Sequence, residues 1–242
     1  MTNGAQRPSN LREHASWNEA MAGRYDPDAF INKTSWPIRW MESLRLKKTC
    51  RALEPRPGDL VLDLGCGSGN LIELLANTQA VGVDLSQRLL NQAKSRLRSH
   101  PNAYLVKAPG ECLPFADGTF DRIVCSEMLE HVLKPEAVLK EMSRVAKAQA
   151  KIVITLPNET IINRIKRLVL ALGLKKILAK DYPMSDDMLQ QWHLHEVDRP
   201  WLERQLNGGT LRLTSESTAP GPWAPFHYIF CLEKAPVSSS KK

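Results

Sequence analysis

The sequence predicts an α/β protein in which a largely parallel sheet carries helices on both faces. Short apolar segments typical of strands alternate with segments of helical periodicity between residues 60 and 156. A glycine-rich turn, Gly65-Cys66-Gly67-Ser68-Gly69, joins the first of these strands to the next apolar pattern. Strand, glycine-rich turn and helix are typical of a nucleotide-binding βαβ unit, because glycine lets a ligand approach the backbone closely.

The chain ahead of this unit is expected to be helical. Residues 1–10 are polar and are predicted to be disordered, as are the tail residues 237–242. Residues 11–54 are predicted to form a helical cover, with a helix start at Ser35-Trp36-Pro37 because proline suits the first turn. Residues 11–236 are thus expected to form a single domain.

The elements of the nucleotide-binding region follow in order along the chain. The expected strands are residues 60–64, 80–83, 104–107, 122–126 and 151–156. The expected helices begin near residue 70 and cover residues 86–98 and 135–147. Beyond residue 157 we expect an amphipathic basic segment at 161–180, a helix at 198–206 capped by Asp198, strands at 211–216 and 228–233, and a loop at 218–226.

Composition indicates the cellular compartment, the relation to membranes and the charge of a possible partner. The five cysteines form no C-x-x-C pair, which predicts reduced and buried thiols in a cytoplasmic setting. The sequence has no secretory signal pattern and no apolar run of about 20 residues, so we expect a soluble or peripheral protein. The net charge of +7 is compatible either with an anionic partner or with solvated lysines.

Four motifs carry a resemblance to a known family. They are Asp63–Gly69, Val81–Ser86, Leu113–Asp121 and Ser126–Val132. In this order they resemble the class I S-adenosylmethionine-dependent methyltransferases, and within them the ubiquinone and menaquinone biosynthesis group. The resemblance implies a Rossmann-like, seven-stranded mixed sheet whose last strand is antiparallel, with S-adenosylmethionine as the cofactor.

The resemblance also implies which residues meet the methionine part of the cofactor. Gly65, Cys66 and Gly67 would form the turn that faces it. Asp63 would help to hold its ammonium group. Ser126, where the fourth strand ends, would lie close to the methionine carboxylate or the sulfonium.

For the adenosine part, the resemblance assigns Asp84 to the two ribose hydroxyls and Leu85 to the adenine. The alternative for Asp84 is a helix N-cap, but Ser86 is better placed for that role. Many relatives have an aspartate that binds the adenine amino group just before the third motif. This chain has a proline there, so backbone groups of Gly110 and Glu111 are expected to serve adenine instead.

Two polar clusters are the candidates for chemistry on the methyl acceptor. Glu127-x-x-Glu130-His131 has three interpretations: His131 as a general base, the three residues as a divalent metal site, or a turn that satisfies nearby backbone. We take His131 as the catalytic candidate and assign no metal. His193-Leu194-His195-Glu196 either touches the acceptor or is a solvated turn.

The segment 161–180 bears on the choice of acceptor. A helix with an apolar face and flanking lysines and arginines can lie on an anionic membrane surface, or it can pack on the domain with its charges solvated. Within a lid-like insertion at 161–197, it favours a small lipophilic acceptor methylated on oxygen, with carbon and nitrogen as alternatives. An RNA methyltransferase and a non-catalytic S-adenosylmethionine-binding sensor or accessory subunit are the competing hypotheses.

Overall fold

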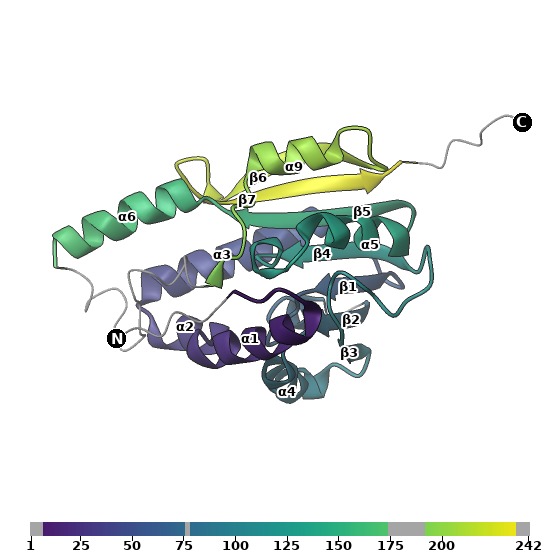
Figure 1. Cartoon of the computed structure of the whole chain (residues 1–242), viewed down its shortest axis with the longest axis horizontal. Coiled ribbons are helices and arrows are strands. Elements are labelled where there is room, and N and C mark those ends of the chain that lie inside the picture. The colour runs from purple at the N-terminus through teal and green to yellow at the C-terminus, as the bar shows by residue number, and fades with distance from the viewer. Residues whose placement is uncertain (1–6, 76–77, 174–191, 236–242) are drawn as a thin grey trace, which may run out of the picture.

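The computed structural model describes residues 7–75, 78–173 and 192–235, which form a seven-stranded sheet in the order β3-β2-β1-β4-β5-β7-β6 (Figure 1). The strands are β1 (Leu60–Leu64), β2 (Gln79–Asp84), β3 (Ala103–Lys107), β4 (Phe120–Ser126), β5 (Ala146–Pro157), β6 (Leu211–Gly221) and β7 (Ala224–Lys234). Strands β1 to β5 are parallel, whereas β7 is antiparallel to both β5 and β6. The predicted mixed sheet is therefore confirmed.

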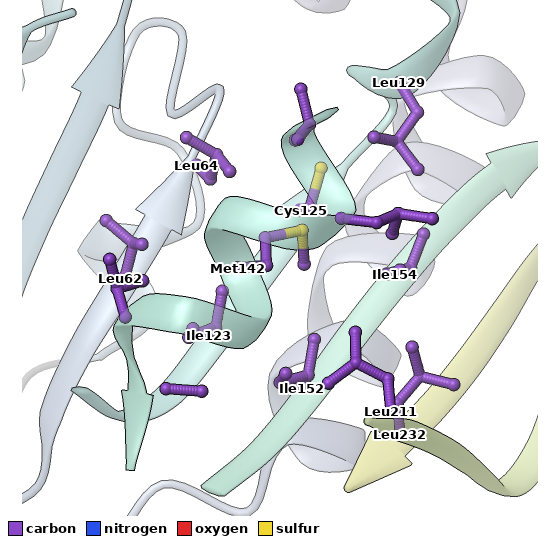
Figure 2. Close-up of a cluster of buried hydrophobic side chains, with 14 of the residues drawn as sticks. Leu62, Leu64, Ile123, Cys125, Leu129, Met142, Ile152, Ile154, Leu211 and Leu232 are labelled. Carbon is purple, nitrogen blue, oxygen red and sulfur yellow. The ribbon is translucent and has the colours of Figure 1, made fainter. Parts of the chain in front are cut away.

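Helices cover both faces of this sheet because successive strand residues point to opposite sides. On one side, Leu62 and Ile123 belong to a buried cluster with α5 (Pro135–Val145), whose Met142 is fully buried, and with α9 (Arg199–Leu206) (Figure 2). On the other side, Val61 and Val124 pack with Leu53 of α3 (Trp36–Leu53). Helix α4 (Gln87–Arg96) packs beside β2 and β3.

The predicted helix ends are confirmed at several points. Ser86 caps α4 by accepting a hydrogen bond from the backbone N–H of Leu89, and Asp198 caps α9 through the N–H of Trp201. The cover consists of three helices rather than one unbroken segment: α1 (Leu11–Arg24), α2 (Pro27–Lys33) and α3. The last of them begins at Trp36, directly after Ser35.

Three local expectations are wrong. The apolar pattern after residue 70 forms only a single 3₁₀ turn, η1 (Ile72–Leu74), instead of a helix. The segment 218–226 is largely strand, because β6 and β7 continue to a tight connection after Gly221. Cys112 is exposed, although Cys66, Cys125 and Cys231 are buried as expected.

The segment after β5 begins as helix α6 (Glu159–Ala171), which projects from the body of the molecule in Figure 1. Three apolar side chains near its outer end are exposed: Ile165 by 41%, Leu168 by 58% and Leu172 by 61%. The remainder of the predicted lid, residues 174–191, lies outside the described residues, as do residues 1–6 and 236–242. Among the described helices, none has the length and apolar character that crossing a bilayer requires.

Candidate functional site

A cavity of about 320 Å³ lies at the carboxyl ends of β1 and β4, where the strand order of the sheet reverses. Ligands of open α/β sheets bind at such a switch point. Every cofactor residue predicted from the sequence lines this cavity, and so does the catalytic candidate. These residues are Asp63, Gly65, Cys66, Gly67, Asp84, Leu85, Gly110, Glu111, Ser126 and His131.

The glycine-rich turn leaves room for a ligand at one position and is tightly packed at another. Gly65 has a φ of +76°, and a Cβ added there would lie 2.6 Å from the Cγ atom of Met128. A side chain at Gly65 would therefore be both strained and crowded. At Gly67, also with a positive φ of +52°, a Cβ would meet nothing within 4 Å. The open side of the turn is thus free to receive part of a ligand.

Asp84 joins the end of β2 to this turn. Its Oδ2 accepts a hydrogen bond of 2.9 Å from the N–H of Gly67, and its Oδ1 accepts one of 2.8 Å from the N–H of Ser86. Burial raises the pKa of Asp84, and the hydrogen bonds from Ser86 and Gly67 offset part of that rise. A carboxylate oxygen can accept more than one hydrogen bond, so each oxygen of Asp84 can also receive one from a ribose hydroxyl.

Asp63 of β1 carries a buried carboxylate. It is 2% exposed, and its Oδ2 atom has no hydrogen bond among the described residues. Burial and the neighbouring charge of Asp84 raise the pKa of Asp63 to about 7. A buried carboxylate of this kind requires a cationic partner to stay ionised. The sulfonium and ammonium groups of S-adenosylmethionine are cations, so the donor set at this end of the cavity fits that cofactor.

Gly110 and Glu111, which we expect to serve adenine, line a further part of the cavity. Glu111 Oε1 accepts a hydrogen bond of 2.9 Å from the N–H of Leu133, whereas its Oε2 is buried without a partner among the described atoms. A Cβ at Gly110 would collide with the methyl group of Met128. Close packing therefore requires glycine at this position, and the free oxygen of Glu111 is available to a donor on the ligand.

The Glu127-x-x-Glu130-His131 segment does not act as one cluster. Glu127 turns toward β5 and β7, where its Oε1 accepts a 2.7 Å hydrogen bond from Thr155 and its Oε2 lies 3.5 Å from Nε2 of His227. Glu130 and His131 instead gather with His193, and one ligand-type atom from each lies within 4.8 Å of the others. The segment thus contributes to two separate polar regions, and of the second, formed by Glu130, His131 and His193, only His131 lines the cavity.

Burial sets the ionisation of the second region. The pKa of Glu130 is raised well above its ordinary value by burial and by the charge of Glu127. The pKa of His131 is lowered to about 3 by burial and by its neighbour His193. His131 is therefore a neutral imidazole near neutral pH. Its Nδ1 lies 3.1 Å from the carbonyl oxygen of Trp192, which favours the tautomer with the proton on Nδ1.

The two histidines of the 193–196 segment have different surroundings. His193 Nδ1 lies 2.6 Å from Oε1 of Glu159, and the His193 ring packs edge-on against His131 at 5.0 Å between centroids. His195 Nε2 instead pairs with the carbonyl oxygen of Leu133, and His195 does not line the cavity. The structure thus places only His193 close to the candidate residue His131.

Sequence reasoning missed Arg45 and His227, which also line the cavity. Arg45 of α3 has a side chain only 12% exposed and donates to Oε2 of Glu42 and to Oγ of Ser126, at 2.9 and 2.7 Å. The only local signal was the position of Arg45 four residues before the buried Thr49 of α3, which is weak evidence. His227 lies in β7, far along the chain from every recognised motif.

Hydrogen bonds and an ion pair hold the helical cover over the cavity. Asp28 of α2 accepts hydrogen bonds from Ser68 and Asn70 of the glycine-rich turn and pairs with Arg96 of α4 at 2.8 Å. Nε2 of His14 in α1 lies 2.8 Å from the carbonyl oxygen of His131. The cover and the cofactor turn therefore form one connected unit.

The sheet, its switch-point cavity and the carboxylates at the ends of β1 and β2 define a class I S-adenosylmethionine-dependent methyltransferase. The family described as "Methyltransferase domain" matches residues 62–154, and the chain belongs to this family. Its cofactor is S-adenosylmethionine. The matched residues span the strands from β1 to β5 and thus include the glycine-rich turn.

Similar proteins come from several bacteria. A demethylmenaquinone methyltransferase of Corynebacterium urealyticum is 36% identical over 59% of this chain and 59% of its own length. A ubiquinone biosynthesis O-methyltransferase of Xanthomonas axonopodis pv. citri is 33% identical over 62% of this chain and 67% of its own length. The chain therefore spans less than two thirds of the first of these relatives. The solved structure of N-methyltransferase NodS from Bradyrhizobium japonicum has a TM-score of 0.64 at 14% identity and covers 92% of this chain and 98% of that one, which supports the fold alone.

The affinity for S-adenosylmethionine is expected to fall when the pH drops below the pKa of Asp63, which is about 7. Protonation removes the negative charge that pairs with the cationic ligand, so affinity should fall by roughly tenfold for each pH unit below that value. Calorimetric titration between pH 5.5 and 8 measures the effect. The Asp63→Asn variant should bind weakly without this pH dependence, and a flat profile for the native chain would contradict the assignment.

Proposed function

We propose that the chain transfers the methyl group of S-adenosylmethionine to a hydroxyl oxygen of a small, lipophilic aromatic acceptor of the quinone-precursor type. The observation that carries this proposal is the juxtaposition in one cavity of the cofactor carboxylates, Asp63 and Asp84, with the polar wall of Ser126, Glu127 and His227. A hydroxyl-bearing acceptor finds hydrogen-bond partners on that wall. The named activities of the two relatives above support the quinone class.

When bound, S-adenosylmethionine supplies the electrophilic methyl group, so the protein contributes alignment and electrostatics. Asp63 and Asp84 hold the cofactor at its amino-acid end and its ribose. The glycine-rich turn brings the ligand close to the backbone, and the α1–α2 cover limits access of water from above the turn. Arg45 places a guanidinium near Ser126, where it suits the methionine carboxylate.

The experiment that tests the function uses S-adenosylmethionine labelled on its methyl group. The purified protein is incubated with a catechol, a demethylmenaquinol, a cell-lipid extract and total RNA, and the products are resolved by mass spectrometry. Label on the catechol oxygen supports the proposal. Label on a menaquinol carbon would move the assignment to C-methylation, and label in RNA would replace the lipophilic acceptor. Binding of the cofactor without label in any fraction would favour the sensor or accessory hypothesis.

A second component of the proposal concerns a divalent metal ion held by Glu130, His131 and His193. The Nδ1 atoms of both histidines are already engaged, by Trp192 and by Glu159, which leaves both Nε2 atoms available. Oε2 of Glu130 is buried without a partner among the described residues. Imidazoles oriented in this way are typical of metal ligands. Such an ion would supply a Lewis acid for an acceptor oxygen. The low pKa of His131 weighs against its role as the base.

Removal of metal distinguishes a metal-ligand role of His131 from a role as the general base. If the site binds a metal, dialysis against a chelator should reduce turnover at least tenfold, and Mg²⁺ or Mn²⁺ should restore it. The Glu159→Gln variant should weaken metal affinity by about 10- to 100-fold, since it loosens His193. Binding of S-adenosylhomocysteine serves as the control and should not change on chelation. Full turnover after chelation would remove the metal from the mechanism.

The proposed lipophilic acceptor is consistent with the exposed apolar end of α6. Ile165, Leu168 and Leu172 lie three and four residues apart and so share one side of the helix, and Arg164 and Arg167 are exposed beside them. An apolar strip flanked by cations suits the surface of an anionic membrane. We propose that this end of α6 contacts the membrane in which such an acceptor dissolves.

Flotation with vesicles tests the membrane contact. The native chain should bind vesicles that contain anionic lipid, and the triple variant Ile165→Ser, Leu168→Ser, Leu172→Ser should lose at least tenfold of that binding. Each buried apolar side chain contributes on the order of 1–2 kcal/mol, so three of them suffice for this loss. The Leu213→Ser variant, at an exposed position on β6, is the matched control. Equal flotation of native and triple-variant protein would remove the contact.

A further inference from the structure

A directed chain of hydrogen bonds crosses the polar wall of the cavity. Arg45 donates to Oγ of Ser126 at 2.7 Å, and Ser126 and Thr155 are joined at 2.9 Å between their hydroxyl oxygens. Thr155 donates its proton to Oε1 of Glu127 at 2.7 Å, so the hydroxyl of Ser126 must donate to Thr155. Every proton in this chain points from the guanidinium toward the carboxylate. Glu127 is thereby fixed through one oxygen, and its second oxygen stays free for another partner.

The backbone of Glu127 is also held in an unusual conformation. Its φ is +52°, in the left-handed region that residues other than glycine seldom occupy. Its N–H donates to the carbonyl oxygen of Thr155 at 3.2 Å, which holds this conformation at the end of β4. Local strain that the surrounding structure maintains beside a cavity is a reason to look for a function. Here it aims the carboxylate across the ends of β5 and β7.

The free oxygen of Glu127 faces His227. Nε2 of His227 lies 3.5 Å from Oε2 of Glu127, and the two side chains are 15% and 21% exposed. His227 is paired with Pro157 of β5 in the sheet, so it lies at the carboxyl end of β5 where the cavity opens. A carboxylate beside Nε2 favours the tautomer with the proton on that nitrogen, and the lone pair then resides on Nδ1. Long contacts of this kind often shorten when a ligand binds.

We propose that His227, oriented by Glu127, is the catalytic base that takes the proton from the acceptor hydroxyl. This inference rests on the proposed transfer to a hydroxyl group. In the step, the O–H bond of the acceptor breaks and its proton passes to Nδ1 of His227. The acceptor oxygen forms the new bond to the methyl carbon, while the electron pair of the carbon–sulfur bond stays on sulfur. The imidazolium later releases its proton to water.

The surrounding charges suit that step. Glu42 and Glu127 contribute two carboxylates and Arg45 one guanidinium, which leaves one net negative charge beside His227. Burial alone would raise the pKa of Glu42, but the charge of Arg45, with a further contribution from His227 when that ring is protonated, outweighs burial and holds the pKa below its ordinary value. Glu42 therefore remains ionised near neutral pH. A negative environment stabilises the imidazolium that forms when the proton is transferred.

The first test varies the acidity of the acceptor. For catechol, the His227→Gln variant should lose about 10²- to 10⁴-fold in kcat, the range typical of a general base. For nitrocatechol, whose hydroxyl is already ionised near neutral pH, the loss should shrink to less than fivefold. The Glu127→Gln variant should show the same pattern with a smaller loss. His100→Gln, in the turn before β3 and outside the cavity lining, should match the native rate for both acceptors. An equal loss for both acceptors, or no loss, would overturn the base role.

The second test does not depend on any acceptor. Nitrogen NMR of histidine-labelled protein should find the neutral ring of His227 protonated on Nε2, and Glu127→Gln should abolish this preference. Comparison with His227→Gln assigns the signal, and binding of S-adenosylhomocysteine confirms that each variant is folded. A native ring protonated on Nδ1 overturns the proposal, even if the protein methylates a hydroxyl. Failure to methylate any hydroxyl, with the expected tautomer present, instead overturns the proposed function and with it the proton transfer.

Discussion

Replacing Asp84 with alanine is expected to abolish measurable binding of S-adenosylmethionine. The substitution would remove the proposed hydrogen bonds to the ribose hydroxyls and the two bonds that Asp84 accepts from the N–H groups of Gly67 and Ser86. Hydrogen bonds to a charged group contribute about 1.5–3 kcal/mol each, so losing those to the ribose should weaken binding by roughly 10²- to 10⁴-fold. Calorimetric titration with S-adenosylhomocysteine measures this loss.

Two companion variants complete that test. Asp84→Asn keeps one acceptor oxygen and should recover part of the affinity. Asp117→Ala removes a carboxylate that is 80% exposed and far from the cavity lining, and it should bind like the native chain. Unchanged affinity in Asp84→Ala would disprove the ribose assignment.

Replacing Arg45 with methionine is expected to cause the second large effect, and it should act on stability and binding together. The substitution leaves Glu42 as a largely but not fully buried carboxylate, 16% exposed, without its cation. Breaking a buried ion pair from one side costs about 3–5 kcal/mol, which corresponds to a fall of roughly 10 °C in Tm for a domain of this size. The substitution would also remove the guanidinium that is proposed to bind the methionine carboxylate of the cofactor. Thermal unfolding and calorimetry measure the two losses separately.

The double variant Glu42→Gln, Arg45→Met distinguishes the two roles. It removes both charges, so it should recover most of the lost stability, since replacing a whole buried ion pair is often nearly neutral. Its affinity for S-adenosylhomocysteine should remain low. Recovery of both properties would show that Arg45 only balances Glu42 and does not meet the cofactor.

Most of the fold could be predicted from the sequence, because apolar periodicity and the residues that begin or end helices and strands are local signals. The alternation of strands and helices between residues 60 and 156, the Ser86 cap and the Asp198 cap all depend on near neighbours in the chain. The helix expected after residue 70 failed for a different reason. The described chain forms a single 3₁₀ turn before β2 begins at Gln79, and apolar periodicity does not distinguish such a turn from a longer helix.

The residues of the candidate site likewise include some that could be predicted from the sequence and some that could not. Asp63, Gly67 and Asp84 belong to short motifs, and the structure brings them to one cavity as the sequence predicted. Arg45 and His227 could not be found by such reasoning. Arg45 meets Ser126 from 81 positions away, and His227 reaches Glu127 from the last strand of the sheet. Contacts between distant elements depend on the strand order, which no local pattern encodes.

The bond between His14 and the carbonyl oxygen of His131 joins residues 117 positions apart. Helix α1 can contact α4 as soon as α4 has been synthesised, but it gains the bond to His131 only after the segment that follows β4 has also been synthesised. The apolar side chains of Trp17 and Met21, which are buried in the finished fold, pack with Trp192 and Leu194 and therefore lack these partners until later still. The cofactor site can therefore close only after segments far along the chain have joined α1.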